Sequence, residues 1–193
     1  MTKSGRIELM APAGDFTSLQ AALDNGADSI YFGVEQLNMR ARASMNFTIL
    51  DLPEISRRCK EKGVRTYLTL NTIIYDHDLS IIKTLLDKAK EADLTAVIAM
   101  DQAVIAYARQ IGMEVHISTQ INITNIETVK FYALFADTMV MSRELSITQI
   151  KKICSQIEKE QIKGPSGNLV EIEIFGHGAL CMAVSGKSYI SLH

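Results

Sequence analysis

The chain has 193 residues, of which 47% are hydrophobic, so it is long and apolar enough to fold as one domain with a sizeable core. Twenty basic and twenty-two acidic residues leave a net charge of −2, which excludes a global positive field for nucleic acid or an anionic membrane. The longest apolar runs, such as 94–100, fall far short of the ~20 residues that a membrane span needs. Three widely spaced cysteines, at 59, 154 and 181, make no disulfide framework, so a cytoplasmic location is expected.

Short β-branched or apolar runs alternate with amphipathic segments, a pattern typical of parallel strands joined by crossover helices. Seven strands are predicted, at 7–10, 29–32, 64–70, 96–99, 114–117, 138–141 and 170–175. Six helices separate them: one capped by Asp15 and ending before Gly26, one starting near Pro53 and ending before Gly63, then 79–91, 103–111, 126–135 and one opening at Ser146. Ser146 and Gln149 have the spacing of a capping box. The predicted fold class is therefore α/β.

No linker or low-complexity tract divides the chain, and the turn-forming loop 163–168 only joins the last helix to the seventh strand. A repeated strand–helix unit closes either as an eight-fold barrel or as an open doubly wound sheet. Polar groups follow all seven strands, whereas an open sheet concentrates its site at one switch point, so the pattern favours the barrel. A complete barrel takes ~250 residues and eight strands. We therefore expect residues 1–193 to form a single TIM-like β/α barrel domain that is incomplete at its C-terminus.

The working groups of such folds lie on the loops that leave the carboxyl ends of the strands. The candidate substrate-binding residues on this criterion, with one histidine inside a strand, are Asp15, Asn38, Arg40, Arg42, Asn71, His116, Ser118, Gln120 and Arg143. Three arginines from two loops suit bidentate binding of a carboxylate or phosphate, so an anionic ligand is expected. Asp15 is also explained by a helix cap alone, and Glu144 is either an ion-pair partner of these arginines or a general base.

The candidate catalytic residues are His177, Cys181 and Glu144. His177 stands between two glycines at a strand end, where a substrate can approach closely. His116 alternates with apolar neighbours, so it either points into the barrel as a ligand or acid–base group or is a hydrogen-bonded core histidine. Cys181 is a conceivable nucleophile, a buried small hydrophobe or one ligand of a cluster.

Several catalytic motifs are absent from the sequence. There is no His-Glu-x-x-His helix, Gly-x-Ser-x-Gly elbow, Gly-x-x-x-x-Gly-Lys loop or glycine-rich dinucleotide turn. Standard hydrolase machinery is therefore missing.

Seven blocks in the same order resemble the collagenase-like peptidase family U-32. They are ELMAPAGD at 8–15, ADSIYFG at 27–33, NMRARA at 38–43, YLTLNT at 67–72, HISTQ at 116–120, SRELS at 142–146 and HGALCMA at 177–183. The resemblance implies a fold similar to a β/α barrel. It also implies either a collagenase-type peptidase activity or, as in other members, oxygen-independent hydroxylation of transfer RNA, ribosomal RNA or a ubiquinone precursor.

The hydroxylation members resemble iron-sulfur proteins bound by four cysteines, and their transfer-RNA branch is associated with prephenate. Here Cys181 stands alone, because Ser188 occupies the place of the second cysteine and the chain stops at His193. One thiolate cannot hold a cluster, so no cofactor is expected in this chain as it stands. An iron-sulfur cluster with Cys181 as a ligand is expected only in a longer protein with further cysteines.

The leading hypothesis is the N-terminal barrel of an enzyme in RNA hydroxylation, at a transfer-RNA wobble uridine or in ribosomal RNA. Its expected partners are a small, prephenate-like carboxylate and RNA bound through a further C-terminal region, with no membrane. The alternatives are a peptidase of undefined mechanism and a non-catalytic barrel that docks substrate for another protein.

Overall fold

The structure, a computed structural model, describes residues 7–34, 47–178 and 185. Its strands are β1 (Met10–Pro12), β2 (Ser29–Phe32), β3 (Arg65–Leu70), β4 (Ala96–Ala99), β5 (Glu114–Ile117), β6 (Thr138–Val140) and β7 (Glu171–Glu173). Its α-helices are α1 (Phe16–Asp24), α2 (Leu52–Glu61), α3 (Leu79–Glu91), α4 (Gln102–Gln110), α5 (Ile126–Tyr132) and α6 (Ile147–Glu160). Three short 3₁₀ helices add η1 (Ile49–Asp51), η2 (Asp76–Asp78) and η3 (Thr119–Ile121). The predicted alternation of strands and helices is confirmed.

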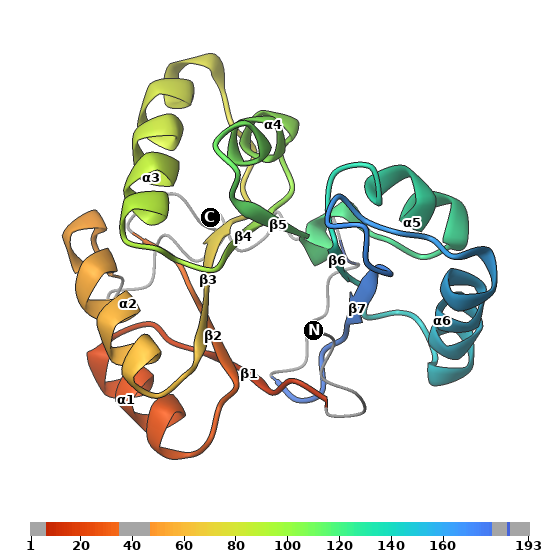
Figure 1. Cartoon of the computed structure of the whole chain (residues 1–193), viewed down its shortest axis with the longest axis horizontal. Helices are drawn as coiled ribbons and strands as arrows, with labels where there is room; N and C mark the ends of the chain where they lie inside the picture. Colours follow the sequence, from red (N-terminus) through yellow and green to blue (C-terminus); the bar gives the residue numbers. More distant parts are fainter. Residues whose placement is uncertain (1–6, 35–46, 179–184, 186–193) are drawn as a thin grey trace.

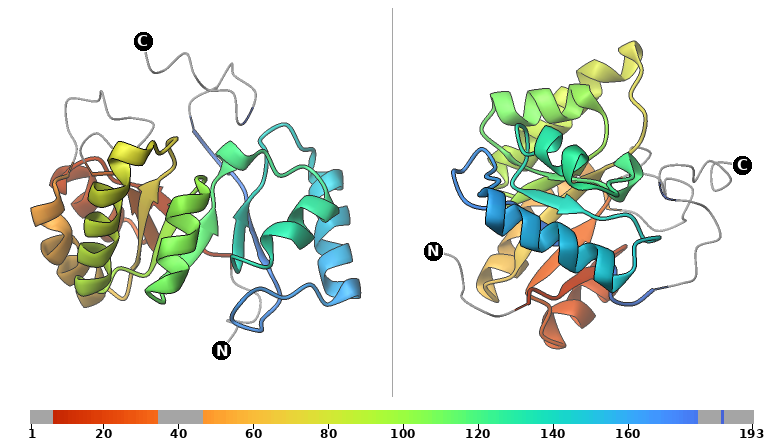
Figure 2. Two further views of the ribbon diagram at one scale, coloured as in Figure 1. Left: turned by 90° about the horizontal axis from the view of Figure 1, so that it is seen from above. Right: turned by 90° about the vertical axis from the view of Figure 1, so that its right-hand side faces the viewer.

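All strand pairs are parallel, and the order in the sheet is the order in the chain, from β1 to β7. The strands lie along an arc, and the helices cover its outer side (Figure 1). Seen from above, α1, α2 and α3 lie on one flank, α5 and α6 on the other, and α4 between them (Figure 2). The result is a half-barrel, which agrees with the expected incomplete β/α barrel.

The two faces of the sheet differ in polarity. Outward side chains such as Leu68, Val97 and Ile117 are fully buried in the main apolar core beneath the helices. Side chains that alternate with them, such as Tyr67 and His116, point to the inner side of the arc, where the apolar cluster is small. The helices therefore form the core with the outer face and leave the inner face free to carry polar groups.

Some element ends differ from the sequence prediction. The strand predicted at 7–10 begins at Met10, because the sheet register starts with the pair Met10 and Ser29. The last strand is limited to Glu171–Glu173, and α5 ends at Tyr132 although the apolar pattern continued to 135. Pairing with the neighbouring strand, which a single segment does not reveal, sets the ends of these two strands.

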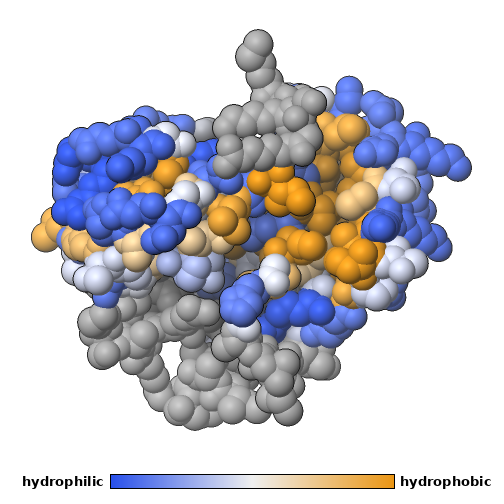
Figure 3. Space-filling view, turned by 90° about the horizontal axis from the view of Figure 1, so that it is seen from below, coloured by the Kyte–Doolittle hydropathy of each residue, from blue (hydrophilic) through white to orange (hydrophobic). Residues whose placement is uncertain are grey.

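Apolar side chains are exposed beside both edge strands. Ile7 and Leu9 precede β1, and Ile174 and Phe175 follow β7. The space-filling view from below shows apolar surface gathered between two hydrophilic flanks (Figure 3). Among the described residues, no helix has the length and apolar character required to cross a bilayer.

Candidate functional site

The loops after β5 and β6 are tied together at the carboxyl end of the sheet. Asn122 has a left-handed backbone with φ 60°, which turns its side chain so that Oδ1 accepts a short hydrogen bond from the Ser142 hydroxyl. The backbone N–H of Ser142 also donates to the carbonyl of Ile123 at 3.0 Å. These two hydrogen bonds fix the backbone just before Arg143, in the loop that follows β6.

Arg143 and Glu144 both contact Ser185, which is buried. The backbone N–H of Arg143 donates to Ser185 Oγ at 3.3 Å, and Glu144 Oε1 accepts the backbone N–H of Ser185 at 2.6 Å. Partial burial opposes the charge on Glu144, but this hydrogen bond outweighs it and holds the pKa of the carboxyl below its ordinary value. A carboxylate with a lowered pKa is a weaker base, so Glu144 is better suited to positioning than to proton abstraction.

Arg143 lies next to an aromatic ring. Its guanidinium carbon is 5.9 Å from the centroid of Phe175, and the Phe175 ring is 53% exposed. A small cavity of about 120 Å³ is lined by these two residues together with Leu145, Ile147 and Ile174. We name this pair, Arg143 and Phe175, the mouth platform.

Ser118 and Gln120 follow β5. Ser118 is buried and caps η3 by accepting the backbone N–H of Gln120 at 3.3 Å, and the Gln120 side chain is half-buried. Asn71, which follows β3, is also half-buried. All three therefore lie at the strand ends, as the sequence indicated, and their contact with a substrate stays a prediction.

Asp15 is the N-cap of α1. Its Oδ1 accepts the backbone N–H of Ser18 at 2.6 Å, and Ser18 completes the capping box in return. These hydrogen bonds lower the pKa of Asp15. The cap accounts for Asp15 in the structure, and the expected substrate contact stays untested.

Apart from His116, the structure describes one further predicted site residue. His177 is exposed beyond β7. The positions of Asn38, Arg40, Arg42, Cys181 and Ser188 lie outside the described residues, so the predicted meeting of three arginines stays a prediction.

His116 belongs to a group of polar side chains inside the half-barrel, which we name the interior cluster. Its Nε2 lies 3.1 Å from Glu114 Oε1, and its ring centroid is 4.5 Å from that of Tyr67. The interior cluster consists of Glu8, Arg65, Tyr67, Glu114, His116 and Glu173. His116 is thus a buried, hydrogen-bonded histidine that points inward, and a role as a ligand or acid–base group stays a prediction.

The sequence analysis missed the other five members of the interior cluster. A signal was present in the period-two pattern, which places Arg65 and Tyr67 on one face of β3 and Glu114 on the same face of β5 as His116. Which of these face one another depends on the strand register, and that appears only in the folded sheet.

The described cysteines offer no metal or cluster site. Cys59 lies on α2 and Cys154 on α6, and burial raises the pKa of both thiols, to about 11 for Cys59. Among the described residues, no group of three or more potential ligands could hold a metal ion. The described part of the chain therefore does not fit an iron-sulfur cluster by itself.

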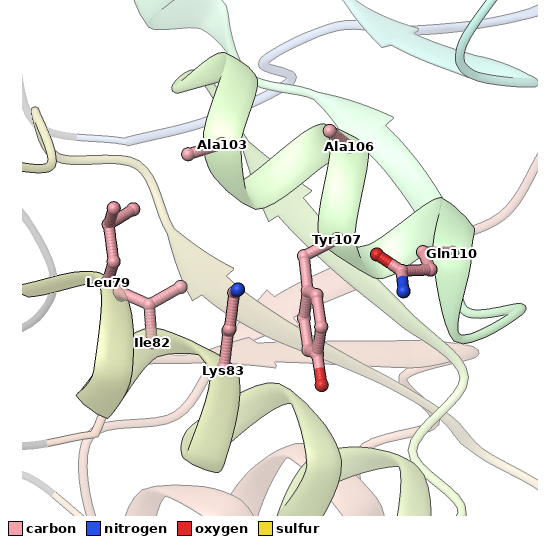
Figure 4. A pocket seen from close by; sticks show the side chains of 7 residues that line it. All are labelled: Leu79, Ile82, Lys83, Ala103, Ala106, Tyr107 and Gln110. Carbon is pink, nitrogen blue, oxygen red and sulfur yellow. The ribbon is translucent and has the colours of Figure 1, made fainter.

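A cavity of about 240 Å³ lies between α3 and α4 (Figure 4). Lys83 and Tyr107 border it, with the Lys83 ammonium 5.3 Å from the Tyr107 ring. The Tyr107 hydroxyl already donates to Asp87 at 2.9 Å. This cavity belongs to the outer helix layer and contains none of the predicted site residues.

A parallel half-barrel with polar groups at its strand ends defines a β/α-barrel protein of the kind that builds its site at that end. The model of peptidase family U32 matches residues 14–193, and the chain belongs to this family.

The relatives carry two kinds of name. The chain is 53% identical over 186 residues to a protein of Porphyromonas gingivalis named collagenase, covering 96% of this chain and 45% of that protein. It is 31% identical over 189 residues to the tRNA hydroxylation protein P1 of Bacillus subtilis, covering 96% of this chain and 42% of that protein. The chain thus spans less than half the length of these relatives.

A solved U32 peptidase structure has the same fold. It superposes with a TM-score of 0.61 over 93% of this chain and 96% of that chain, at 13% identity.

Proposed function

We propose that the chain is the N-terminal barrel of an enzyme that takes part in oxygen-independent hydroxylation of an RNA base, at a transfer-RNA wobble uridine or in ribosomal RNA. The observation that carries the proposal is the mouth platform, in which the Arg143 guanidinium lies 5.9 Å from the Phe175 ring. A reaction between a small carboxylate and a nucleobase needs a cation for the first and a flat apolar surface for the second. The mouth platform offers both, with Arg143 following β6 and Phe175 following the neighbouring β7.

The chemistry of the two side chains matches this pair of ligands. A guanidinium binds a carboxylate through two parallel N–H donors, and an exposed aromatic ring stacks a base at ~1–3 kcal/mol. The hydrogen bond from Arg143 to Ser185 limits the directions that the guanidinium can take. The proposed small ligand is a prephenate-like carboxylate.

The chain's own charge limits how much RNA it holds. A net charge of −2 supplies no basic footprint, and phosphate contacts dominate the affinity of most RNA-binding proteins. In this proposal most of the RNA affinity comes from a further region of a longer protein.

The proposal is tested in a strain that lacks the full-length gene. Nucleoside mass spectrometry of total RNA is expected to show the loss of one hydroxylated pyrimidine. Full-length protein with Arg109→Gln, a change on the outer side of α4, should restore it, and Arg143→Gln should not. An unchanged nucleoside profile in the deletion strain would overturn the proposal.

A second candidate function is proteolysis, which the 53% identity to a protein named collagenase favours. In this case His177 or Cys181 would act with Glu144 or with an added metal. The test is hydrolysis of gelatin by the full-length protein with and without a chelator. Hydrolysis that Glu144→Gln abolishes, in a strain whose RNA is unchanged, would establish this function instead of the first.

A further inference from the structure

The interior cluster runs across the inner side of the half-barrel from the first strand to the last. Glu8 precedes β1, Tyr67 belongs to β3, His116 to β5 and Glu173 to β7. Alternate strands of a β/α barrel contribute to the same inner layer, which explains why only odd-numbered strands take part. Branched apolar side chains usually fill such a layer, so charged side chains in this position need a physical explanation.

The contacts link these residues in series. The Tyr67 hydroxyl donates to Glu8 Oε1 at 2.7 Å, and the Tyr67 ring packs against the His116 ring at 4.5 Å. His116 then contacts a carboxylate on each side, with Nε2 3.1 Å from Glu114 Oε1 and Nδ1 3.9 Å from Glu173 Oε2. The His116 side chain is only 4% exposed, whereas those of Glu114 and Glu173 are 39% and 24% exposed, so the ring is buried and the two carboxylates are partly solvated.

The two ring nitrogens of His116 are not equivalent. Nε2 is within hydrogen-bond distance of a carboxylate, which only accepts, so Nε2 carries a proton. Nδ1 is buried and makes no hydrogen bond, because 3.9 Å to Glu173 exceeds that distance. When the ring is neutral, Nδ1 presents a lone pair towards a carboxylate. When the ring gains a proton, Nδ1 becomes a donor towards the same carboxylate.

We propose that protonated His116 bridges Glu114 on β5 and Glu173 on β7, and that loss of this proton releases the seventh strand from the inner layer. We name this contact the His116 bridge. It is independent of the proposed function, because it concerns how the last strand is held and not what binds above it.

The His116 bridge has a direct connection to the mouth platform. Glu173 is the last residue of β7 and Phe175 lies two residues further along the chain, so a shift of Glu173 moves the segment that carries the Phe175 ring. The β7 backbone is otherwise tied to β6, for example by the hydrogen bond from Met141 N–H to the Glu173 carbonyl at 2.9 Å. β7 is an edge strand of the described sheet, with a partner on one side only. Such a strand depends more than a central strand on side-chain contacts.

The charges around His116 favour its protonation. Burial alone would lower the pKa of His116, but the hydrogen bond to Glu114 and the proximity of Glu173 raise it above its ordinary value. The hydrogen bond to His116 lowers the pKa of Glu114. Arg65 on β3 disfavours protonation of His116, because it also carries a positive charge. Its ion pair with Glu8 partly neutralises that charge. Glu171, in the same row of the sheet as His116, adds a further negative charge.

The sign of the pH dependence follows from these directions. A raised pKa means that the His116 bridge contributes fully below the unfolded-state pKa of about 6.5 and is lost as the pH rises through the higher folded-state pKa. The pKa of Glu114 is lowered, so the stabilisation that the Glu114 carboxylate contributes is lost as the pH falls through this lowered pKa. The His116 bridge therefore acts in a window between the two folded-state pKa values.

The first test is an NMR titration of the four histidines in the wild-type chain, with the His116 signal assigned through His116→Gln. His116 is expected to titrate above about pH 6.5, and its midpoint should fall in Glu173→Gln. Glu171→Gln is the matched control: it removes the same charge from an exposed position of the same strand, so it should lower the midpoint less than Glu173→Gln does. A wild-type midpoint at or below that value, or one that Glu173→Gln does not lower, would overturn the proposal.

The second test measures hydrogen exchange of the peptide that contains β7, with each variant compared with wild type at the same pH. Glu173→Gln should speed this exchange roughly fivefold near pH 6, and the ratio should approach one at about pH 9. A merely structural role for Glu173 would give the same ratio of exchange rates, variant to wild type, at both pH values. This pattern would contradict the His116 bridge, even if His116→Gln fails to fold.

Discussion

A single guanidinium carries most of the ligand chemistry proposed for the described residues. Arg143 is exposed, and its direction is set by Ser185 and the Phe175 ring. Arg143→Gln is expected to weaken binding of prephenate by about tenfold, because a bidentate charge-assisted contact becomes a single neutral one. Titration calorimetry on the full-length protein measures the change. Arg109→Gln on the outer side of α4 should leave the affinity unaltered, and equal losses in both variants would indicate a long-range charge effect instead.

Gln120 and Asn71 provide a second test at the scale of single residues. Both are half-buried at strand ends, where polar side chains contribute to binding more than to the core. Replacing either by alanine should cost less than about 1 kcal/mol of unfolding free energy in urea denaturation and should reduce activity. A loss above about 2 kcal/mol would identify the residue as a member of a buried hydrogen-bond network.

At the scale of elements, the start of α6 depends on a capping box. Ser146 Oγ accepts the backbone N–H of Gln149 at 3.3 Å, and Gln149 Oε1 accepts that of Ser146 at 2.8 Å. Ser146→Ala should lower the unfolding free energy by about 1 kcal/mol, because an orphan N–H of the first turn loses its acceptor. Ser155→Ala, in the exposed middle of the same helix, is the control and should be neutral or slightly stabilising.

The turn between α6 and β7 fits closely against the chain that enters β6. A Cβ on Gly164 would lie 2.8 Å from the Asp137 Cα, while Asp137 Oδ1 accepts both the N–H and the hydroxyl of Ser166. Gly164→Ala should therefore destabilise the fold by about 1–3 kcal/mol, measured by thermal unfolding. Gly176→Ala adds a methyl group to open space and should cost much less. Similar losses for both would show that the clash is relieved by a small backbone shift.

The element boundaries show how far local sequence signals reach. The strands at 29–32, 96–99 and 114–117 and the helix at 79–91 have the predicted ends, because each is a buried or amphipathic run with clear flanks. The first and last strands do not, because each is an edge strand whose length depends on a single partner. The capping residues Asp15 and Ser146 were predictable, since a cap involves residues only three positions apart.

At the scale of the whole molecule, exposed apolar residues line the segments beside both edges of the sheet. Leu9 is 60% and Ile174 46% exposed. The chain alone is expected to bind an apolar dye and to self-associate with rising concentration, because open edges and apolar patches favour association. Leu9→Ser combined with Ile174→Ser should reduce both effects in light scattering. Ile81→Ser, an equally exposed apolar site on α3, should not.

The candidate site was less predictable than the fold. Polar residues after each strand indicated which end carries the site, and Ser118, Gln120 and Arg143 lie there. The contact of Arg143 with Phe175 joins two strands and could not be read from either one. The interior cluster was missed for the same reason, because an inward side chain acquires its partners only when the register of several strands is set.

The identity of strand order and chain order has a consequence for synthesis on the ribosome. Each strand pairs with the one made just before it, as Met10 does with Ser29 and Ser29 with Arg65, so no strand waits for a distant partner. The sheet can grow by one strand at a time as the polypeptide emerges, with each helix covering the newest apolar face. Parallel strands normally fold slowly because their connections are long, and this order keeps every connection as short as a crossover allows. Besides the open edge of β1, the nascent chain would thus expose only one growing edge at any moment.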